Sequence, residues 1–455
     1  MIRAIRESLH YPKLTSKPYL MDILRGFGGL IFLTAVAYLL SSNKKSIPWS
    51  TVAIGVTLQI LFGLAIFKIG FVHSGFEWIS EKFVAFLDFA RQGAMFLFGG
   101  LAKDSTKDPT AGHSLGFLFA FQALPTVIFF SAVTTGLYYL GILQKIVYVF
   151  AWVMTRTMRL SGAESLSAAA NIFMGQTEAP LLVKPFIKNM TDSELFCLMT
   201  GGMATIAGSV LAVYVGMLGG ADEQSRATFA TYLLCASIMN APAAIVMSKI
   251  VFPEMHPEKI DKSLKVNKEA IGSNLVDALA TGAADGLKLA LNIGGMLLAF
   301  IAIILAINWG LEGLGDLVGI NGLIRESTDN AYSGLSLEYL LGQIFRFFAF
   351  AMGVNWSESL QVGSLLGKKM VLNEFLAYSD LTAFKNGGYL SEKSIIISTY
   401  ALCGFANFSS IAIQIGGIGG MAPNRQTDLS KLGFKSMLAA FLATMMTGTI
   451  AGAIF

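Results

Sequence analysis

Charged residues are scarce in this chain. Only 14% of its 455 residues are Asp, Glu, Lys or Arg, whereas a soluble domain carries about 25%. Hydrophobic residues make up 54%, and the mean hydropathy is +0.62. This balance excludes a water-soluble enzyme, a disordered chain, a collagen and a coiled coil, and it predicts one polytopic membrane domain.

Residues that build metal centres and disulfide scaffolds are also few. The three cysteines lie inside apolar stretches, which predicts packed thiols, and the four histidines lack metal-ligand spacing. We find no nucleophile triad, so the chain is not expected to be an enzyme or to need an organic cofactor. The net charge is only +4, with no basic stretch interleaved with aromatics, so no nucleic-acid partner is expected.

Long apolar runs predict an all-α polytopic membrane protein with about eight transmembrane helices, since a span needs about 20 mostly apolar residues. The expected spans are 23–42, 51–72, 115–141, 195–219, 227–252, 288–309, 394–419 and 434–455. Residues 1–20 form a polar arm that is unlike a signal peptide. Three segments that mix charges with aromatics, 76–98, 143–160 and 337–351, predict interfacial amphipathic helices.

Loop charge gives an expected orientation. Lysine and arginine gather in loops 43–45, 249–268 and 422–435, which are therefore expected inside, and both termini outside. The basic N-terminal arm contradicts this orientation.

Two stretches repeat the same order of landmarks. Glutamates at 164, 178 and 194 in the first correspond to those at 358, 374 and 392 in the second. Each copy follows an amphipathic segment and precedes two long spans. With the expected topology the copies are inverted, and inverted repeats are a signature of secondary transporters with a site at the membrane midplane.

A segment in each copy is too short and too polar to cross the membrane. Residues 165–190 and 359–388 predict re-entrant hairpins, with tips at 175–178 and 373–374. The expected organisation has five parts: the polar arm 1–20, scaffold helices 21–142, a first transport repeat 143–252, a basic linker with a long scaffold helix 253–336, and a second transport repeat 337–455.

The hairpin tips carry the candidate binding chemistry. A carboxylate at membrane depth costs roughly 2.5–3.5 kcal/mol, so Glu178 and Glu374 are expected to bind substrate or, alternatively, to cap the structure. Hydrogen-bonding groups suited to a nucleobase edge come from Gln176, Thr177 and Glu178, and groups suited to sugar hydroxyls from Glu374, Asn407 and Ser410.

Hard oxygen ligands lie close to the first tip. The side chains of Asn171 and Thr205, with nearby carbonyls, are suited to a small hard cation. On spacing alone this signal is weak, because such residues often only join membrane helices.

The motifs NIFMGQTEAP (171–180), TIAGSV (205–210), NEFLAY (373–378) and CGFANFSS (403–410) resemble the concentrative nucleoside transporter family, from about residue 25 to the C-terminus. The resemblance implies a homotrimer in a cell membrane, for a bacterium the inner membrane, that imports nucleosides such as uridine with Na⁺. It assigns base contacts to Gly175, Gln176, Thr177, Glu178 and Val210, and ribose contacts to Glu374, Phe405, Asn407 and Ser410. It assigns sodium to the side chains of Asn171 and Thr205 and the carbonyls of Met174 and Ile206.

Two alternatives remain open from the sequence. Some family members couple to protons, although Asn171 favours sodium, and a channel for polar solutes would require a continuous polar path. The run Gly282–Gly286 has small residues four apart, so the long helix 274–309 is expected to form the trimer contact, or to pack within one protomer.

Overall fold

The computed structural model describes residues 16–102, 118–220, 222–264, 272–328 and 330–455. These residues fold into helices and contain no strand. The first helices are α2 (Ser16–Leu40), α3 (Trp49–Lys68), α4 (Gly70–Phe98), α5 (Phe119–Gln122), α6 (Leu124–Tyr139), α7 (Ile142–Met158), α8 (Gly162–Ala170), α9 (Lys184–Ile187), α10 (Asp192–Ala204), α11 (Gly208–Gly219) and α12 (Glu223–Val251). The later ones are α13 (Leu275–Leu317), α14 (Asn321–Ser327), α15 (Leu337–Ala351), α16 (Ser359–Val371), α17 (Glu374–Asn386), α18 (Glu392–Leu402), α19 (Phe408–Met421) and α20 (Gln426–Ile454). Short 3-10 helices are η1 (Lys44–Ser46), η2 (Gly99–Ala102), η4 (Ala179–Val183), η5 (Pro257–Lys259), η6 (Trp356–Glu358) and η7 (Pro423–Arg425).

Seven helical segments of the described residues are long and apolar enough to cross a membrane. They are Leu20–Leu40, Trp49–Lys68, Phe119–Tyr139, Asp192–Gly219, Glu223–Val251, Leu275–Leu317 and Pro423–Ile454. The eighth predicted span, 394–419, is divided between α18 and α19, and neither helix alone is long enough to cross a membrane. The first residues of the predicted arm and of the span 115–141 lie outside the described residues, as does 265–271 of the basic linker.

The sequence prediction was wrong about where the second span ends. Helix α3 stops at Lys68, and after Ile69, which has an extended backbone, α4 begins at Gly70 and continues to Phe98. Along α4, Ser80 accepts a hydrogen bond from Thr231 of α12 at 2.8 Å, and Asp88 lies 3.7 Å from Arg226 nearer the start of α12. Helix α4 thus runs antiparallel to α12, a candidate span, which differs from the interfacial position predicted for 76–98.

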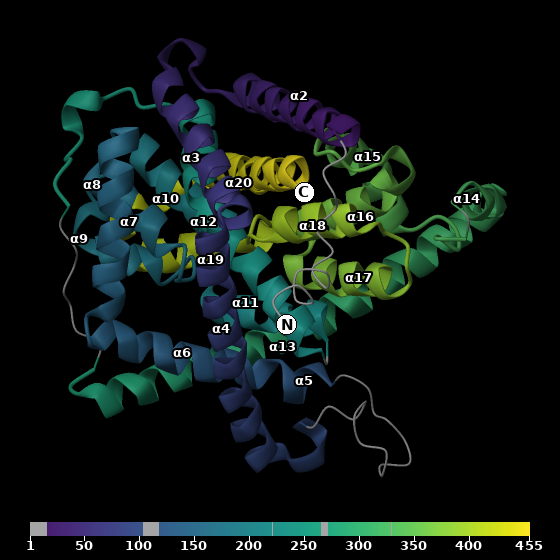
Figure 1. The fold of residues 1–455 in the computed structure, drawn as a ribbon, viewed down its shortest axis with the longest axis horizontal. Coiled ribbons are helices and arrows are strands. Elements are labelled where there is room, and N and C mark those ends of the chain that lie inside the picture. Colours follow the sequence, from purple (N-terminus) through teal and green to yellow (C-terminus); the bar gives the residue numbers. More distant parts are fainter. Residues whose placement is uncertain (1–15, 103–117, 221, 265–271, 329) are drawn as a thin grey trace.

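The two repeats have the same order of elements. In each, an amphipathic helix (α7 or α15) precedes a helical hairpin, a broken helix (α10 and α11, or α18 and α19) and a long buried helix (α12 or α20). Figure 1 shows α7–α9 on the left and α15–α17 on the right, with α12 and α20 between them. Helix α10 packs against α20, and α18 packs against both α12 and α20, so the repeats share one core.

Several of the repeated landmark residues cap helices. Ser161 and Glu164 form a capping box at the start of α8, and Thr191 and Glu194 form another at the start of α10. Glu164 also forms a buried ion pair with Lys249 near the end of α12. These glutamates therefore fix helix ends, and they do not lie at the hairpin tips.

Two glycines of α13, Gly282 and Gly286, pack against α6 of the same protomer. A Cβ atom added to Gly286 would lie 2.8 Å from the Ile128 Cα of α6, and one added to Gly282 would lie 2.6 Å from the Thr135 Oγ1. The expectation that this run forms the trimer contact is therefore wrong for its glycines. The opposite face of α13 remains exposed and apolar, with Leu291, Leu298, Leu305 and Trp309.

Replacing Gly286 with valine should destabilise the contact between α6 and α13. The added side chain has no space, and overpacking of this kind costs about 1–3 kcal/mol. We expect a lower melting temperature of the detergent-purified protein, measured by intrinsic fluorescence. The control is Gly93→Val inside α4, where a Cβ atom meets nothing within 4 Å. Equal melting temperatures for the two variants would contradict this packing.

Candidate functional site

The first hairpin turns immediately after Asn171, the residue that ends α8. From there the chain passes through 171–178 into η4, which packs against α8. At the turn, the backbone N–H of Gly175 donates to Glu178 Oε2 at 3.0 Å. Thr177 is exposed and Glu178 is half-buried. The Glu178 carboxylate thus closes its own turn while it remains accessible at the tip.

The second hairpin places a carboxylate deep in the protein. Asn373 caps α17 by accepting from the backbone N–H of Leu376 at 3.0 Å, so Glu374 becomes the first residue of that helix. The Glu374 side chain is only 2% exposed. Its Oε1 accepts from the Tyr214 hydroxyl at 2.9 Å, and its Oε2 accepts from Asn407 Nδ2 at 3.0 Å. Such charge-assisted bonds are the strong ones inside a protein.

The break between α18 and α19 presents the second polar group. Asn407 caps α19 because its Oδ1 accepts from the Ser410 backbone N–H at 2.9 Å, while its Nδ2 faces Glu374. The Ser410 hydroxyl accepts from Gln176 Nε2 at 3.1 Å, and Gln176 Oε1 accepts from Gln414 Nε2 at 3.2 Å. Hydrogen bonds therefore run from Glu374 at the second tip to Gln176 at the first.

The two helix breaks touch one another. The backbone N–H of Phe405 donates to the Thr205 carbonyl at 3.3 Å, and the half-buried Phe405 side chain packs against the core. Val210 lies in the first turn of α11, one turn before Tyr214, and is 2% exposed. The structure thus brings together residues that the sequence assigned separately to base and sugar.

Two of the four predicted cation ligands, Asn171 and Thr205, lie beside Gly201. Both polar side-chain atoms of Asn171 are buried without a hydrogen-bond partner, and its Nδ2 lies 3.2 Å from where a Gly201 Cβ atom would be. The Thr205 hydroxyl donates to the Gly201 carbonyl at 2.9 Å. Met174 and Ile206 are also buried. An unpartnered buried amide beside a helix end fits a cation that takes neutral oxygen ligands.

The described residues offer no cluster of acidic residues or histidines as an alternative cation site. Among the described residues, no group of three or more His, Cys, Asp or Glu could hold a metal ion. A cation bound by the described residues would therefore rely on amide, hydroxyl and carbonyl oxygens, which suit hard ions.

Three site residues were missed by the sequence reasoning. Tyr214 donates to Glu374, Gln414 donates to Gln176, and Lys369 is wholly buried in the second hairpin. Tyr214 carries the one hydroxyl in the apolar stretch 210–219, and Lys369 is a charge five residues before Glu374. Both signals were visible, but their partners lie far away in sequence.

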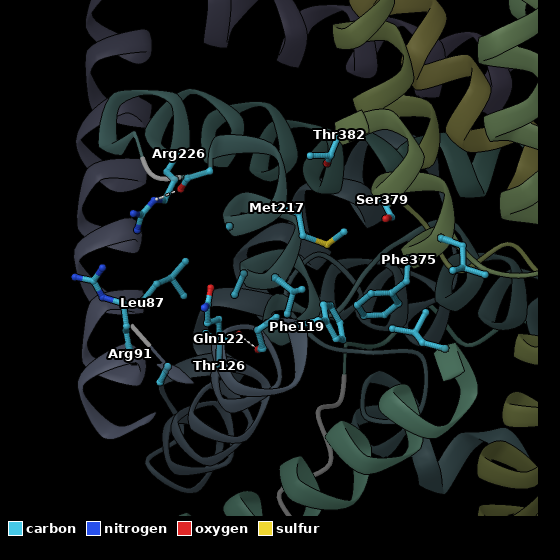
Figure 2. A pocket seen from close by; sticks show the side chains of 18 of the residues that line it. Leu87, Arg91, Phe119, Gln122, Thr126, Met217, Arg226, Phe375, Ser379 and Thr382 are labelled. Atoms are coloured by element: carbon cyan, nitrogen blue, oxygen red, sulfur yellow. Dashed lines mark hydrogen bonds between the residues drawn. The ribbon is translucent and has the colours of Figure 1, made fainter. Parts of the chain in front are cut away.

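A cavity of about 680 Å³ adjoins this region, a size within the usual range for ligand pockets. Figure 2 shows Leu87, Arg91 and Arg226 on one side, Phe375, Ser379 and Thr382 on the other, and Phe119, Gln122 and Thr126 along the base. None of the predicted site residues lines it. However, it reaches Phe375, the neighbour of Glu374, and Val213, the neighbour of Tyr214.

Three family models match this chain. Models described as Na⁺ dependent nucleoside transporter match at residues 28–101 (N-terminus) and 232–452 (C-terminus), and one described as nucleoside recognition matches at residues 120–221. An uncharacterized transporter of Bacillus subtilis is 41% identical over 95% of this chain and 99% of its own length. The sodium/nucleoside cotransporter 1 of mouse is 37% identical over 95% of this chain, which spans 64% of that longer protein.

Solved structures agree with this similarity. The structure of CNTnw in an inward-facing substrate-bound state matches with a TM-score of 0.84 at 37% identity, covering 95% of this chain and 98% of that one. An outward-facing state of a CNTnw variant matches with the same TM-score and identity over the same shares of both chains. The chain is therefore a multi-pass integral membrane protein that belongs to the concentrative, sodium-dependent nucleoside transporter family.

Proposed function

We propose that this sodium-coupled nucleoside symporter binds its substrate between the two hairpin tips. The ribose hydroxyls donate to Glu374 and bond to Asn407 and Ser410, while the base meets Gln176, Thr177 and Glu178. Gly175, Val210 and Phe405 form the walls. The observation that carries this assignment is Glu374, a carboxylate 2% exposed that already accepts from two neutral donors, Tyr214 and Asn407.

Neutral donors suit the binding of a neutral sugar. A cationic partner in direct contact would satisfy the carboxylate strongly and compete with hydroxyl donors. Tyr214 and Asn407 orient the two Glu374 oxygens instead, and each carboxylate oxygen accepts more than one hydrogen bond. The proposal therefore assigns a vicinal diol as the group that Glu374 recognises, and uridine is a suitable first substrate.

The sodium ion is proposed to bind at the break of α10. Its ligands are the Asn171 and Thr205 side chains and the Met174 and Ile206 carbonyls. Asn171 and Gln176 belong to the same turn of the first hairpin. An ion that orders this turn also orders the residue that meets the base, which couples the two binding events.

The cavity supplies an access path in this proposal. It lies between α11 and α17, which hold the site, and α4, α5 and α13. The hairpins with their broken helices move as a unit against a fixed scaffold, and the exposed face of α13 joins three copies into a homotrimer. Outward-facing, intermediate and inward-facing states are known for the related CNTnw and its variants. The relatives support a bacterial inner membrane as the location.

Glu374→Gln should greatly reduce uridine binding. Charge-assisted bonds to the carboxylate contribute about 1.5–3 kcal/mol each, so we expect the dissociation constant to rise at least tenfold by calorimetry. Tyr214→Phe should have a smaller effect in the same direction, while Tyr378→Phe is the control, because that hydroxyl donates to the Thr399 carbonyl. The wild type should bind 2′,3′-dideoxyuridine poorly. Equal affinity for uridine and this analogue would refute the diol assignment.

Asn171→Ala should raise the sodium concentration needed for half-maximal uridine uptake into proteoliposomes. The amide oxygen is a proposed sodium ligand, so its removal should weaken sodium binding more than it changes the selectivity among nucleosides. Asn189→Ala, an exposed asparagine in the same hairpin segment, serves as the control. Unchanged sodium dependence would remove Asn171 from the ion site, and uptake driven by a proton gradient alone would favour the proton-coupled alternative.

Movement of the hairpins should be visible as a change of thiol access. The native cysteines are all buried, which leaves Thr177→Cys at the first tip as a clean reporter. Its reaction with a membrane-impermeant thiol reagent should change side as sodium and uridine are varied. Leu317→Cys, 84% exposed at the end of α13, should keep one pattern. Simultaneous access to Thr177→Cys from both sides would favour a channel.

A further inference from the structure

Lys369 is a buried lysine whose charge the transport scheme above leaves unexplained. Its side chain is fully buried in α16 of the second hairpin. The Nζ donates to the Ala401 carbonyl and to the Thr444 hydroxyl, both at 2.8 Å, and lies 5.6 Å from the centre of the Phe441 ring. An ammonium group in such surroundings is costly unless it is compensated.

The Ala401 carbonyl lies in the last turn of α18, just before the helix break. Carbonyls in the last turn of a helix lack helical partners and form the negative end of the helix dipole. A buried cation placed there is stabilised by the helix, and in turn it satisfies the backbone where α18 stops. Lys369 therefore stabilises the end of the broken helix that leads to Asn407.

The first repeat has the same helix end without a lysine. Helices α10 and α18 begin 200 residues apart (192 and 392), and so do α11 and α19 (208 and 408). Gly201 of α10 therefore corresponds to Ala401 of α18. Gly201 is the residue beside which Asn171 and Thr205 meet, at the proposed sodium site. Both hairpins thus direct a polar side chain to the equivalent end of a broken helix.

The two ends differ in what completes them. At the first, the Asn171 amide is buried and unpartnered, so it can take an exchangeable ion. At the second, the Lys369 ammonium already donates to two oxygen acceptors and lies over the Phe441 ring. The second end is thus completed by a group that belongs to the protein itself.

We propose that Lys369 is a tethered cation, which supplies at the break of α18 the positive charge that sodium supplies at the break of α10. This rests on the sodium site proposed above. Lys369 acts as a positioning residue: it holds the end of α18, so that Asn407 beyond the break, and Glu374 bonded to Asn407, are set for the sugar. One cation is then exchanged in each transport cycle, and the other remains part of the protein.

The test compares two neutral replacements of this lysine in the purified full-length protein. Lys369→Met keeps much of the volume, and Lys369→Gln keeps hydrogen-bond donors for the Ala401 carbonyl. In both, we expect the uridine dissociation constant at saturating sodium to rise at least tenfold. The matched control is Lys368→Met, which removes the neighbouring lysine that pairs with Glu338 and Asp380, and its uridine affinity should equal that of the wild type.

A second readout separates this role from a general structural one. Sodium alone should raise the melting temperature of Lys369→Gln as it does in the wild type, whereas the additional rise with uridine should be lost. Wild-type uridine affinity in Lys369→Gln would overturn the proposal, because a neutral hydrogen-bond donor would then replace the ammonium without loss. Loss of the sodium shift as well as the uridine shift would also overturn it, since that result indicates a distorted fold.

A third variant does not depend on replacing the lysine. Thr444→Val removes one acceptor of the ammonium and leaves the charge in place. We expect uridine affinity to fall about threefold and sodium affinity to stay unchanged, and unaltered uridine affinity would count against the proposal. A wild-type protein that binds uridine without any dependence on sodium would instead refute the proposed sodium coupling, which keeps the two failures distinct.

Discussion

Two helices stop in the middle of the bundle, and the backbone groups exposed there must be satisfied inside the protein. An apolar surrounding offers no water to do so, and each unsatisfied group costs several kcal/mol. The breaks after α10 and α18 are therefore where polar side chains gather. The Thr205 hydroxyl, the Asn240 amide and the Lys369 ammonium each donate to a carbonyl at these breaks. The proposed binding groups follow from this requirement, because groups that satisfy a broken helix also lie at the gap between its halves.

The repeats are related in architecture but differ in chemistry. Glu178 and Glu374 occupy corresponding tips, yet Glu178 is half-buried and closes its own turn, whereas Glu374 is buried between donors from two other helices. Asn171 and Lys369 differ in the same way, one left open and the other satisfied. A pair of identical repeats would bind two identical ligands. In the proposed scheme, different residues at equivalent positions let one scaffold bind an exchangeable ion on one side and a sugar on the other.

Hydrogen bonds across the centre join these differing halves. Gln176 of the first hairpin donates to Ser410 beyond the second break, and Gln414 donates back to Gln176. A ligand that displaces any of these bonds must alter contacts in both repeats. In the proposed scheme, the turn that carries Gln176 also carries Asn171, so these bonds link the sodium and nucleoside sites, which is the structural condition for coupling.

The sequence by itself determined the all-helical membrane class, most of the helix ranges, the order of elements in the two repeats, and the hairpin tips with Glu178 and Glu374. These follow from apolar run length, capping residues and rare polar residues at depth, which act locally along the chain. Only the tertiary structure decided that Tyr214 contacts Glu374, 160 positions away in the chain, and that Gly282 and Gly286 face α6. It also decided that α4 packs alongside α12. Such partners depend on how helices pack, because a helix presents several faces and its sequence does not specify which neighbour each face will meet.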